Sequence, residues 1–216
     1  MTLTAPRFPG LDYHPEVACR HLSDADPKLG ELIEQAGPFL LEPEPTQSLF
    51  AALLESIVYQ QLSGKAAATI LGRVCALHHP RRFPRPADIL ATAPERLRAA
   101  GLSNAKTLAV RDLAAKTLDG TVPSMLRVRR MADDEIVERL TTVRGVGRWT
   151  VEMLLLFRLG RSDVLPVGDL GVRKGFARTF GRRALKDPAV MVRRAERWRP
   201  YRSVASWYMW RALELS

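Results

Sequence analysis

The chain has 216 residues, of which 46% are hydrophobic and 26% charged, enough to bury the core of one large domain or two small ones. Its formal net charge is +10, and the whole excess lies after residue 120, where 20 Lys/Arg stand against 10 Asp/Glu; the residues before it hold 13 of each. A one-sided basic excess favours a polyanion partner, nucleic acid first and an anionic membrane second, although simple solubility in an arginine-rich proteome is the alternative.

The cysteine count and the apolar pattern exclude several classes of protein. Cys19 and Cys75 are the only cysteines, which gives neither a disulfide framework nor a four-cysteine metal or iron–sulfur site. No apolar run approaches the roughly 18 residues of a membrane span. The first residues lack the basic and apolar regions of a signal peptide. We therefore expect a protein of the cytoplasm that is neither secreted nor bound to a membrane.

Helical patterns begin after a proline-rich start. Residues 1–25 show no helical period, which predicts an N-terminal arm, extended or irregularly packed, ahead of a core at 26–216. In "DPKLGELIEQAG", Asp26 as N-cap, Pro27 at the first helical position and Gly37 as the stop predict the first helix.

The rest of the chain also predicts helices, joined by short loops. Ser63 and Ser103 are expected N-caps, and apolar residues recur every three or four positions. No segment alternates convincingly in the manner of a strand, so the fold class is all-α, with about ten helices. The expected segments after the first are 45–60, 63–78, 86–93, 93–101, 103–120, 132–143, 148–160, 168–181, 187–198 and 203–215.

A glycine hairpin separates two of these helices in "TTVRGVGRWTVEM", residues 141–153. Gly145 and Gly147 allow a sharp turn and the close approach of another backbone. Their amides precede a helix N-terminus, which is an anion site, and Arg148 and Thr150 follow at once. A DNA phosphate is the natural anion, contacted without reading sequence. The alternative is an ordinary helix–turn–helix corner that uses glycine for packing.

Five motifs together resemble one family. "LTTVRGVGRWTVEMLLLF" resembles the helix–hairpin–helix of the HhH-GPD superfamily of DNA glycosylases, here at about residues 133–160. "DVLPVGDLGVRKG", "LESIVYQQLSGKAAATI", "GLSNAKTLAVRDLA" and "ERWRPYRSVASWYMWRAL" resemble its AlkA-type branch, the 3-methyladenine DNA glycosylases II. The resemblance covers about residues 25–215 and implies two interleaved helical lobes. It is to a compact form, because the additional N-terminal α/β domain of the bacterial prototype has no counterpart ahead of the helices.

The resemblance implies a catalytic aspartate. In that superfamily a Gly/Pro-rich loop after the hairpin ends in an aspartate that caps the next helix, and Asp169 stands in that place. A carboxylate there stabilises the oxocarbenium-like sugar and orients or deprotonates the attacking water. Its structural alternative is a helix N-cap alone, and both roles are compatible.

Aromatic residues are the expected walls of the base pocket. Bifunctional relatives place a lysine where this chain has Trp149, and an indole forms no Schiff base, so the resemblance implies a monofunctional enzyme with water as nucleophile. Trp149 and Trp210 would stack on a flipped cationic base, with Met153 one turn beyond Trp149. The alternative for both indoles is core packing.

A turn at residues 60–63, named here the insertion turn, is the expected DNA intercalation site. Relatives insert a side chain from this turn through the minor groove, and the resemblance puts Gln61 in that place, with Leu62 as the rival. Ser63 is expected to cap the next helix and to touch the groove.

The resemblance further implies a monovalent cation, Na⁺ or K⁺, on the backbone carbonyls of Thr141, Val143 and Val146. No other cofactor is expected, and no iron–sulfur cluster. The expected partner is double-stranded DNA that contains alkylated bases, bound by a monomer.

The expected reaction is the hydrolytic excision of 3-methyladenine, 7-methylguanine and related bases, which leaves an abasic site. An oxidised-base glycosylase/lyase is the enzyme alternative, opposed by Trp149 and the missing cysteine cluster. A non-catalytic hairpin DNA-binding module is the other, and such a module has no need of Asp169 or of paired indoles.

Overall fold

The computed structural model describes residues 10–44, 46, 48–80, 83–182, 185 and 187–215. Every regular element within these residues is helical, which confirms the all-α class. In the same residues no helix has the length and apolar character needed to cross a membrane. The chain divides into a continuous unit, Thr46–Val151, and a discontinuous unit, Met1–Pro45 with Glu152–Ser216.

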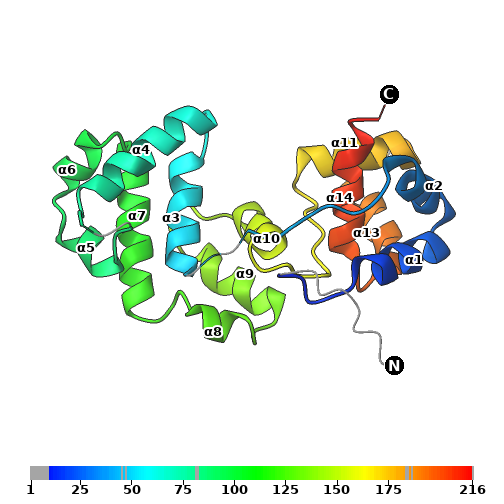
Figure 1. Ribbon diagram of the computed structural model, residues 1–216, viewed down its shortest axis with the longest axis horizontal. Helices are drawn as coiled ribbons and strands as arrows, with labels where there is room; N and C mark the ends of the chain where they lie inside the picture. Colours follow the sequence, from blue (N-terminus) through cyan, green and yellow to red (C-terminus); the bar gives the residue numbers. More distant parts are fainter. Residues whose placement is uncertain are drawn as a thin grey trace. The chain divides into compact units, whose positions relative to one another are not determined.

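Short helices build the continuous unit (Figure 1). Ser48, Ser63, Ser103 and Ser124 each accept a hydrogen bond from a backbone N–H of the following first turn, at 3.0, 3.4, 3.2 and 3.3 Å. This confirms the caps predicted at Ser63 and Ser103. The helices are α3 (Leu49–Tyr59), α4 (Gly64–Ala76), α5 (Pro86–Ala91), α6 (Pro94–Ala99), α7 (Asn104–Leu118), α8 (Met125–Val128), α9 (Asp133–Thr141) and the start of α10 (Arg148–Phe157).

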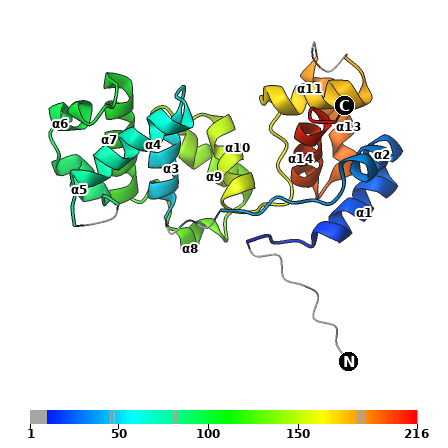
Figure 2. The same ribbon diagram turned by 45° about the horizontal axis from the view of Figure 1, so that its top comes forward.

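Helix α7 is the centre of this unit. It packs against α3, α5 and α6, which both views show around it (Figures 1 and 2). Leu53 and Ile57 of α3 and Leu113 of α7 are fully buried. The single-turn helix α8 was not predicted, because four residues are too few to show a period.

The discontinuous unit is organised around α14. This helix packs against α11, α2 and α1. Phe176, Trp198 and Tyr208 are the largest fully buried side chains of its core. The segment predicted as one helix at 187–198 is an α-helix followed by a 3₁₀ turn. The helices are α1 (Pro15–Ala25), α2 (Pro27–Ala36), α11 (Leu170–Phe180), α13 (Pro188–Ala195), the 3₁₀ helix η1 (Glu196–Trp198) and α14 (Arg202–Ala212).

The predicted N-terminal arm is wrong for residues 15–25. They form α1, whose Ala18 and Leu22 are fully buried in the core of the unit. Pro15 stands in the first turn, where its missing N–H has no intrahelical partner to lose, and no further proline occurs before Pro27. The prolines therefore mark the starts of α1 and α2 and interrupt neither helix. Residues 1–9 of the predicted arm lie outside the described residues.

Asp26 has a different role from the predicted one. It occupies the N-cap position of α2, but its side chain makes no capping hydrogen bond. Arg194 donates to both carboxylate oxygens at 2.6 and 2.7 Å, and Nε1 of Trp198 donates at 3.1 Å. Burial alone would raise the pKa of Asp26, but these donors outweigh it and lower the pKa below its ordinary value.

Candidate functional site

Asp169 stands at the end of the approach loop, residues 158–168, which joins α10 to α11. Its Oδ1 accepts a hydrogen bond from the backbone N–H of Val172 at 2.8 Å, so the predicted capping role is confirmed. Nε1 of Trp210 donates to the same oxygen at 2.9 Å. Two donors from different helices therefore fix the plane of this half-buried carboxylate at a helix N-terminus.

Trp210 is held from two sides within the discontinuous unit. Its ring stacks on Phe157, with centroids 5.6 Å apart and planes at 28°. It is half-buried on α14, as a wall of a pocket requires. The hydrogen bond to Asp169 is a role that its residue type did not predict, and its place in a base pocket stays a prediction.

Two glycines of α11 make room for this arrangement, and neither was predicted in this role. A Cβ at Gly171 would lie 2.7 Å from Cδ1 of Trp210, and one at Gly175 would lie 1.8 Å from the carbonyl oxygen of Met209. Glycine inside a helix costs about 1 kcal/mol against alanine, so two glycines four residues apart were a signal of close helix contact. They let α14 approach α11 closely enough for the indole to meet the carboxylate.

In the continuous unit, the insertion turn leaves the end of α3 in an unusual conformation. Gln61 has φ +57°, the left-handed region that non-glycine residues rarely adopt. Gln61, Leu62 and Ser63 are all exposed. Of the three, Leu62 places a large apolar side chain at the surface. Both candidates for insertion are therefore at the surface, and the choice between them stays a prediction.

Lys106 of α7 holds this turn. Its ammonium donates to the carbonyl oxygens of Val58 and Gln60, each at 2.7 Å. Partial burial of the ammonium lowers the pKa of Lys106 below its ordinary value. Nε2 of Gln60 in turn donates to the carbonyl oxygen of Gly145 at 2.9 Å, which ties the insertion turn to the hairpin.

The hairpin follows the last turn of α9. Gly145 has φ +77°, and a Cβ there would lie 3.4 Å from Cβ of Ala109 on α7, so the predicted need for glycine is confirmed at this position. A Cβ at Gly147 would meet no atom within 4 Å. Packing against the described residues therefore gives no reason for glycine at 147.

Two further side chains of α7 hold the hairpin. Oδ2 of Asp112 accepts from the backbone N–H of Arg144 at 2.7 Å and from Lys116 at 2.9 Å. Lys116 also donates to the carbonyl oxygen of Thr142, at the end of α9. One helix thus supports both segments that the sequence predicted to contact DNA, and neither Lys106 nor Asp112 was predicted in this role.

The residues after the hairpin differ in exposure. Arg148 and Trp149 are exposed, Trp149 by 50%, whereas Thr150 is buried. Successive residues of a helix point about 100° apart, so Thr150 faces inward where Trp149 faces outward. The contact with DNA predicted for Thr150 stays a prediction. Met153 is half-buried on the same face of α10 as Trp149.

The carbonyls predicted to bind a cation lie at the end of α9 and in the hairpin. The oxygen of Val143 accepts from the N–H of Val146 at 3.0 Å. The described residues hold no group of three or more His, Cys, Asp or Glu side chains suited to a metal ion.

A helix–glycine hairpin–helix supported by α7, and an aspartate fixed at the start of a helix, define a helix–hairpin–helix protein with a candidate catalytic carboxylate. The comparison with protein families is more specific. Residues 54–200 match the model of the HhH-GPD superfamily base excision DNA repair proteins, and the chain belongs to this family.

Similar proteins agree with this assignment. DNA-3-methyladenine glycosylase 1 of Schizosaccharomyces pombe is 34% identical over 203 residues, which cover 91% of this chain and 86% of the relative. The structure of a 3-methyladenine DNA glycosylase of the same organism in complex with abasic DNA matches with a TM-score of 0.79 and 32% identity, over 93% of this chain and 98% of that one. A DNA-3-methyladenine glycosidase from Bacillus halodurans matches with a TM-score of 0.81 and 34% identity, over 92% and 89% of the two chains.

Proposed function

We propose that this protein is a monofunctional DNA glycosylase of the 3-methyladenine type. It flips alkylated bases such as 3-methyladenine and 7-methylguanine out of duplex DNA and hydrolyses the N-glycosidic bond, which leaves an abasic site. The names of its relatives support this substrate class. The observation that carries the proposal is the carboxylate of Asp169, fixed by Val172 and Trp210 at the start of α11.

The reaction needs little acid catalysis. An alkylated purine is already cationic, so the C1′–N bond breaks with its electron pair going to the base. Positive charge then builds on the sugar, and a preorganised carboxylate stabilises it. Asp169 supplies that charge and orients the water whose oxygen bonds to C1′, accepting its proton.

Trp149 favours water over a protein nucleophile. A lysine at this place of the hairpin would attack C1′ and lead to strand cleavage, whereas an indole cannot. Half of Trp149 is exposed at the start of α10, which suits stacking on a flipped base. Trp210 and Met153 are the other residues that we assign to the base pocket.

The continuous unit supplies the contacts with DNA in this proposal. The exposed hairpin residues Gly145, Gly147 and Arg148 bind phosphate, and the insertion turn places Gln61 or Leu62 in the space that the base leaves. Alkylated double-stranded DNA is then the partner. The protein acts as a monomer on the chromosomal DNA in the cytoplasm.

The hairpin offers the type of ligand that a monovalent cation binds. The proposed ligands, the backbone oxygens of Thr141, Val143 and Val146, are neutral carbonyls of the type that Na⁺ and K⁺ prefer, and the last carbonyls of α9 carry the negative end of the helix dipole. The ammonium of Lys116 already lies on the oxygen of Thr142, between these ligands in sequence. A bound cation would add charge for a DNA phosphate at the same helix end.

A lesion panel tests the proposal. Duplexes with 3-methyladenine, 7-methylguanine, hypoxanthine or 8-oxoguanine opposite cytosine are incubated with the protein under single-turnover conditions, and strands are analysed with and without alkali. We expect release of the methylated bases, strand breaks only after alkali, and no adduct trapped by borohydride. Efficient trapping, or breaks without alkali, would favour a glycosylase/lyase; binding without any base release would favour a DNA-binding module.

A further inference from the structure

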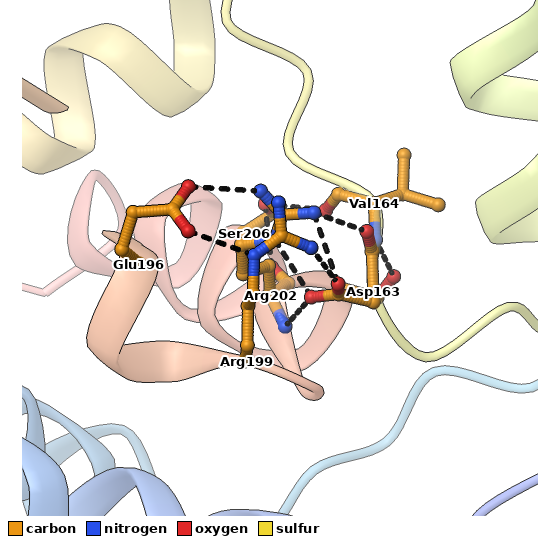
Figure 3. Close-up of polar contacts among 7 residues, drawn as sticks. Asp163, Val164, Glu196, Arg199, Arg202 and Ser206 are labelled. Atoms are coloured by element: carbon orange, nitrogen blue, oxygen red, sulfur yellow. Dashed lines mark hydrogen bonds and ion pairs between the residues drawn. The ribbon is translucent and has the colours of Figure 1, made fainter. Parts of the chain in front are cut away.

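The approach loop leads to Asp169 through eleven residues that form no regular helix. Asp163 is the middle residue of this loop. Nε of Arg202 donates to Oδ1 of Asp163 at 2.7 Å and Nη2 donates to Oδ2 at 2.9 Å, a bidentate pair (Figure 3). Arg199 adds a third hydrogen bond from Nη1 to Oδ2 at 2.5 Å. Glu196 holds Arg199 in turn, through Nε at 2.9 Å.

The backbone beside Asp163 is tied to the same helix. Oγ of Ser203 accepts from the N–H of Val164 at 2.9 Å, and the N–H of Ser203 donates to the carbonyl oxygen of Ser162 at 3.0 Å. Oγ of Ser206 shares its proton between the carbonyl oxygen of Arg202 at 2.8 Å and that of Val164 at 3.2 Å. Both serines are buried, so the first two turns of α14 hold the loop without access of water.

Helix α14 therefore forms hydrogen bonds at two places: the middle of the approach loop and Asp169 at its end. Arg202 binds its middle, and Trp210, eight residues later on α14, binds Asp169 at its end. Eight residues of α-helix rise about 12 Å. Because α14 is a single rigid element, the distance between these two contacts is fixed.

The pair is well protected from solvent. The side chain of Arg202 is 13% exposed and that of Asp163 is 23% exposed, so their attraction is screened less than that of a surface pair. Neither residue lies beside Asp169 in the sequence, and α14 connects them to it. A change in this pair therefore reaches the carboxylate through the position of the loop and of α14.

We infer that Asp163 and Arg202 are positioning residues for Asp169: their bidentate pair sets where the approach loop places the carboxylate against the sugar. The inference rests on the proposed glycosylase function. A misplacement of about 1 Å can cost 10²-fold in rate while substrate binding persists. The pair would then matter for the chemical step more than for the binding of DNA.

The test compares two arginine pairs of the same unit. Arg202→Lys keeps the charge but loses the bidentate fork. Arg194→Lys makes the same change in the bidentate pair with Asp26, which joins α13 to the start of α2 and makes no bond to the approach loop. Single-turnover excision of 3-methyladenine, the Kd for lesion DNA and the urea midpoint are measured for both, at a temperature where circular dichroism shows each protein folded.

We expect Arg202→Lys to lower the single-turnover rate by about 10-fold or more, with the Kd changed by less than about 2-fold. Arg194→Lys should lower the urea midpoint and leave the rate of the folded protein unchanged. Asp163→Asn should repeat the result of Arg202→Lys, and serves where Arg202→Lys fails to fold. Equal losses in the two arginine variants, or a native rate in Arg202→Lys, would overturn the inference.

A variant in the background of Asp169→Asn separates positioning from general damage. If Arg202 acts through the carboxylate, Arg202→Lys should slow the residual reaction of Asp169→Asn by much less than it slows the native enzyme. An undiminished effect would contradict the inference. Failure of the native protein to release any methylated base would instead contradict the proposed function, so the two failures are distinguishable.

Discussion

The indole N–H of Trp210 and the backbone N–H of Val172 donate to the same oxygen of Asp169, at 2.9 and 2.8 Å. The aromatic residue that the sequence suggested as a pocket wall thus also orients the carboxylate. Because one donor comes from α14 and the other from α11, the geometry of Asp169 depends on the close packing of these two helices. This dependence makes several consequences measurable.

Replacing Asp169 by Asn should abolish most of the activity. The amide keeps an oxygen that accepts from Val172 and Trp210, so the cap and the fold should persist, but the negative charge near the sugar is lost. We expect the single-turnover rate to fall by about 10²- to 10⁴-fold, with little change in the Kd for lesion DNA. Asp169→Ala is the control for capping, because it should also cost about 1 kcal/mol in unfolding free energy. Near-native excision by Asp169→Asn would exclude the catalytic assignment.

The two hairpin glycines should respond differently to alanine. Gly145 has φ +77° and lies against Ala109, so Gly145→Ala should strain the hairpin and lower the urea midpoint as well as DNA affinity. A Cβ at Gly147 meets no atom of the described residues within 4 Å, so Gly147→Ala should change stability much less than Gly145→Ala and act mainly on DNA binding. Both losses should be the same for any duplex sequence and should be measured at several salt concentrations. A loss restricted to one sequence would mean that the hairpin reads bases.

Lys106 should be needed for base flipping more than for binding. Lys106→Met leaves the carbonyls of Val58 and Gln60 without their charged donor and releases the left-handed conformation of Gln61. A hydrogen bond to a charged group contributes about 1.5–3 kcal/mol, so excision should slow by about 10-fold or more. Lys28→Met on α2 removes the same charge from an exposed position of the other unit and is the control. Equal losses in the two variants would indicate a net-charge effect on DNA affinity.

Local signals in the sequence predicted much of this structure. Ser63, Ser103 and Asp169 cap helices that begin within three residues of them. Each cap can therefore be predicted without knowledge of the fold. The left-handed glycine at 145 is equally local. Such features depend on neighbours in the chain, which is why they could be predicted from the sequence.

Long-range contacts account for what the sequence did not predict. Asp26 looked like an N-cap, but its partners Arg194 and Trp198 lie 168 and 172 residues away. The burial of an aromatic residue could not be predicted from the sequence either. Trp198 is fully buried and Trp149 is 50% exposed, although each follows an arginine in a predicted helix. Tertiary packing decides both, which is why Asp163 and Arg202 also escaped notice.

The contact of Asp26 with Arg194 predicts a specific loss of stability in acid. The pKa of Asp26 in the folded protein lies below its ordinary value of 3.8, so the ionised carboxylate stabilises the fold above about pH 4. This stabilisation should disappear as the pH falls through the lowered pKa. Asp26→Asn should cost on the order of 3 kcal/mol in unfolding free energy at pH 7, and the difference from the native protein should narrow below pH 4. Urea midpoints from pH 7 to pH 3 measure it, and a difference independent of pH would contradict the role of the charge.

Two substitutions of Trp210 should separate its two functions. Trp210→Phe keeps an aromatic face but removes the N–H that orients Asp169, whereas Trp210→Ala removes both and the stacking on Phe157. Near-ultraviolet circular dichroism at the assay temperature is the folding control, since truncation leaves space beside Gly171.

Excision rates of a cationic and a neutral lesion distinguish the two functions of Trp210. A cationic base such as 7-methylguanine is attracted to an aromatic face by about 0.5–2 kcal/mol, whereas neutral hypoxanthine is not. Trp210→Phe should therefore slow both lesions by a similar factor, because the carboxylate serves both. Trp210→Ala should slow 7-methylguanine by a further factor of about 2 to 30 relative to hypoxanthine. The native enzyme should ignore 8-oxoguanine opposite cytosine, a neutral base with a strong partner. Equal ratios for the two lesions in Trp210→Ala, measured as single-turnover rates, would leave Trp210 with orientation of Asp169 as its only function.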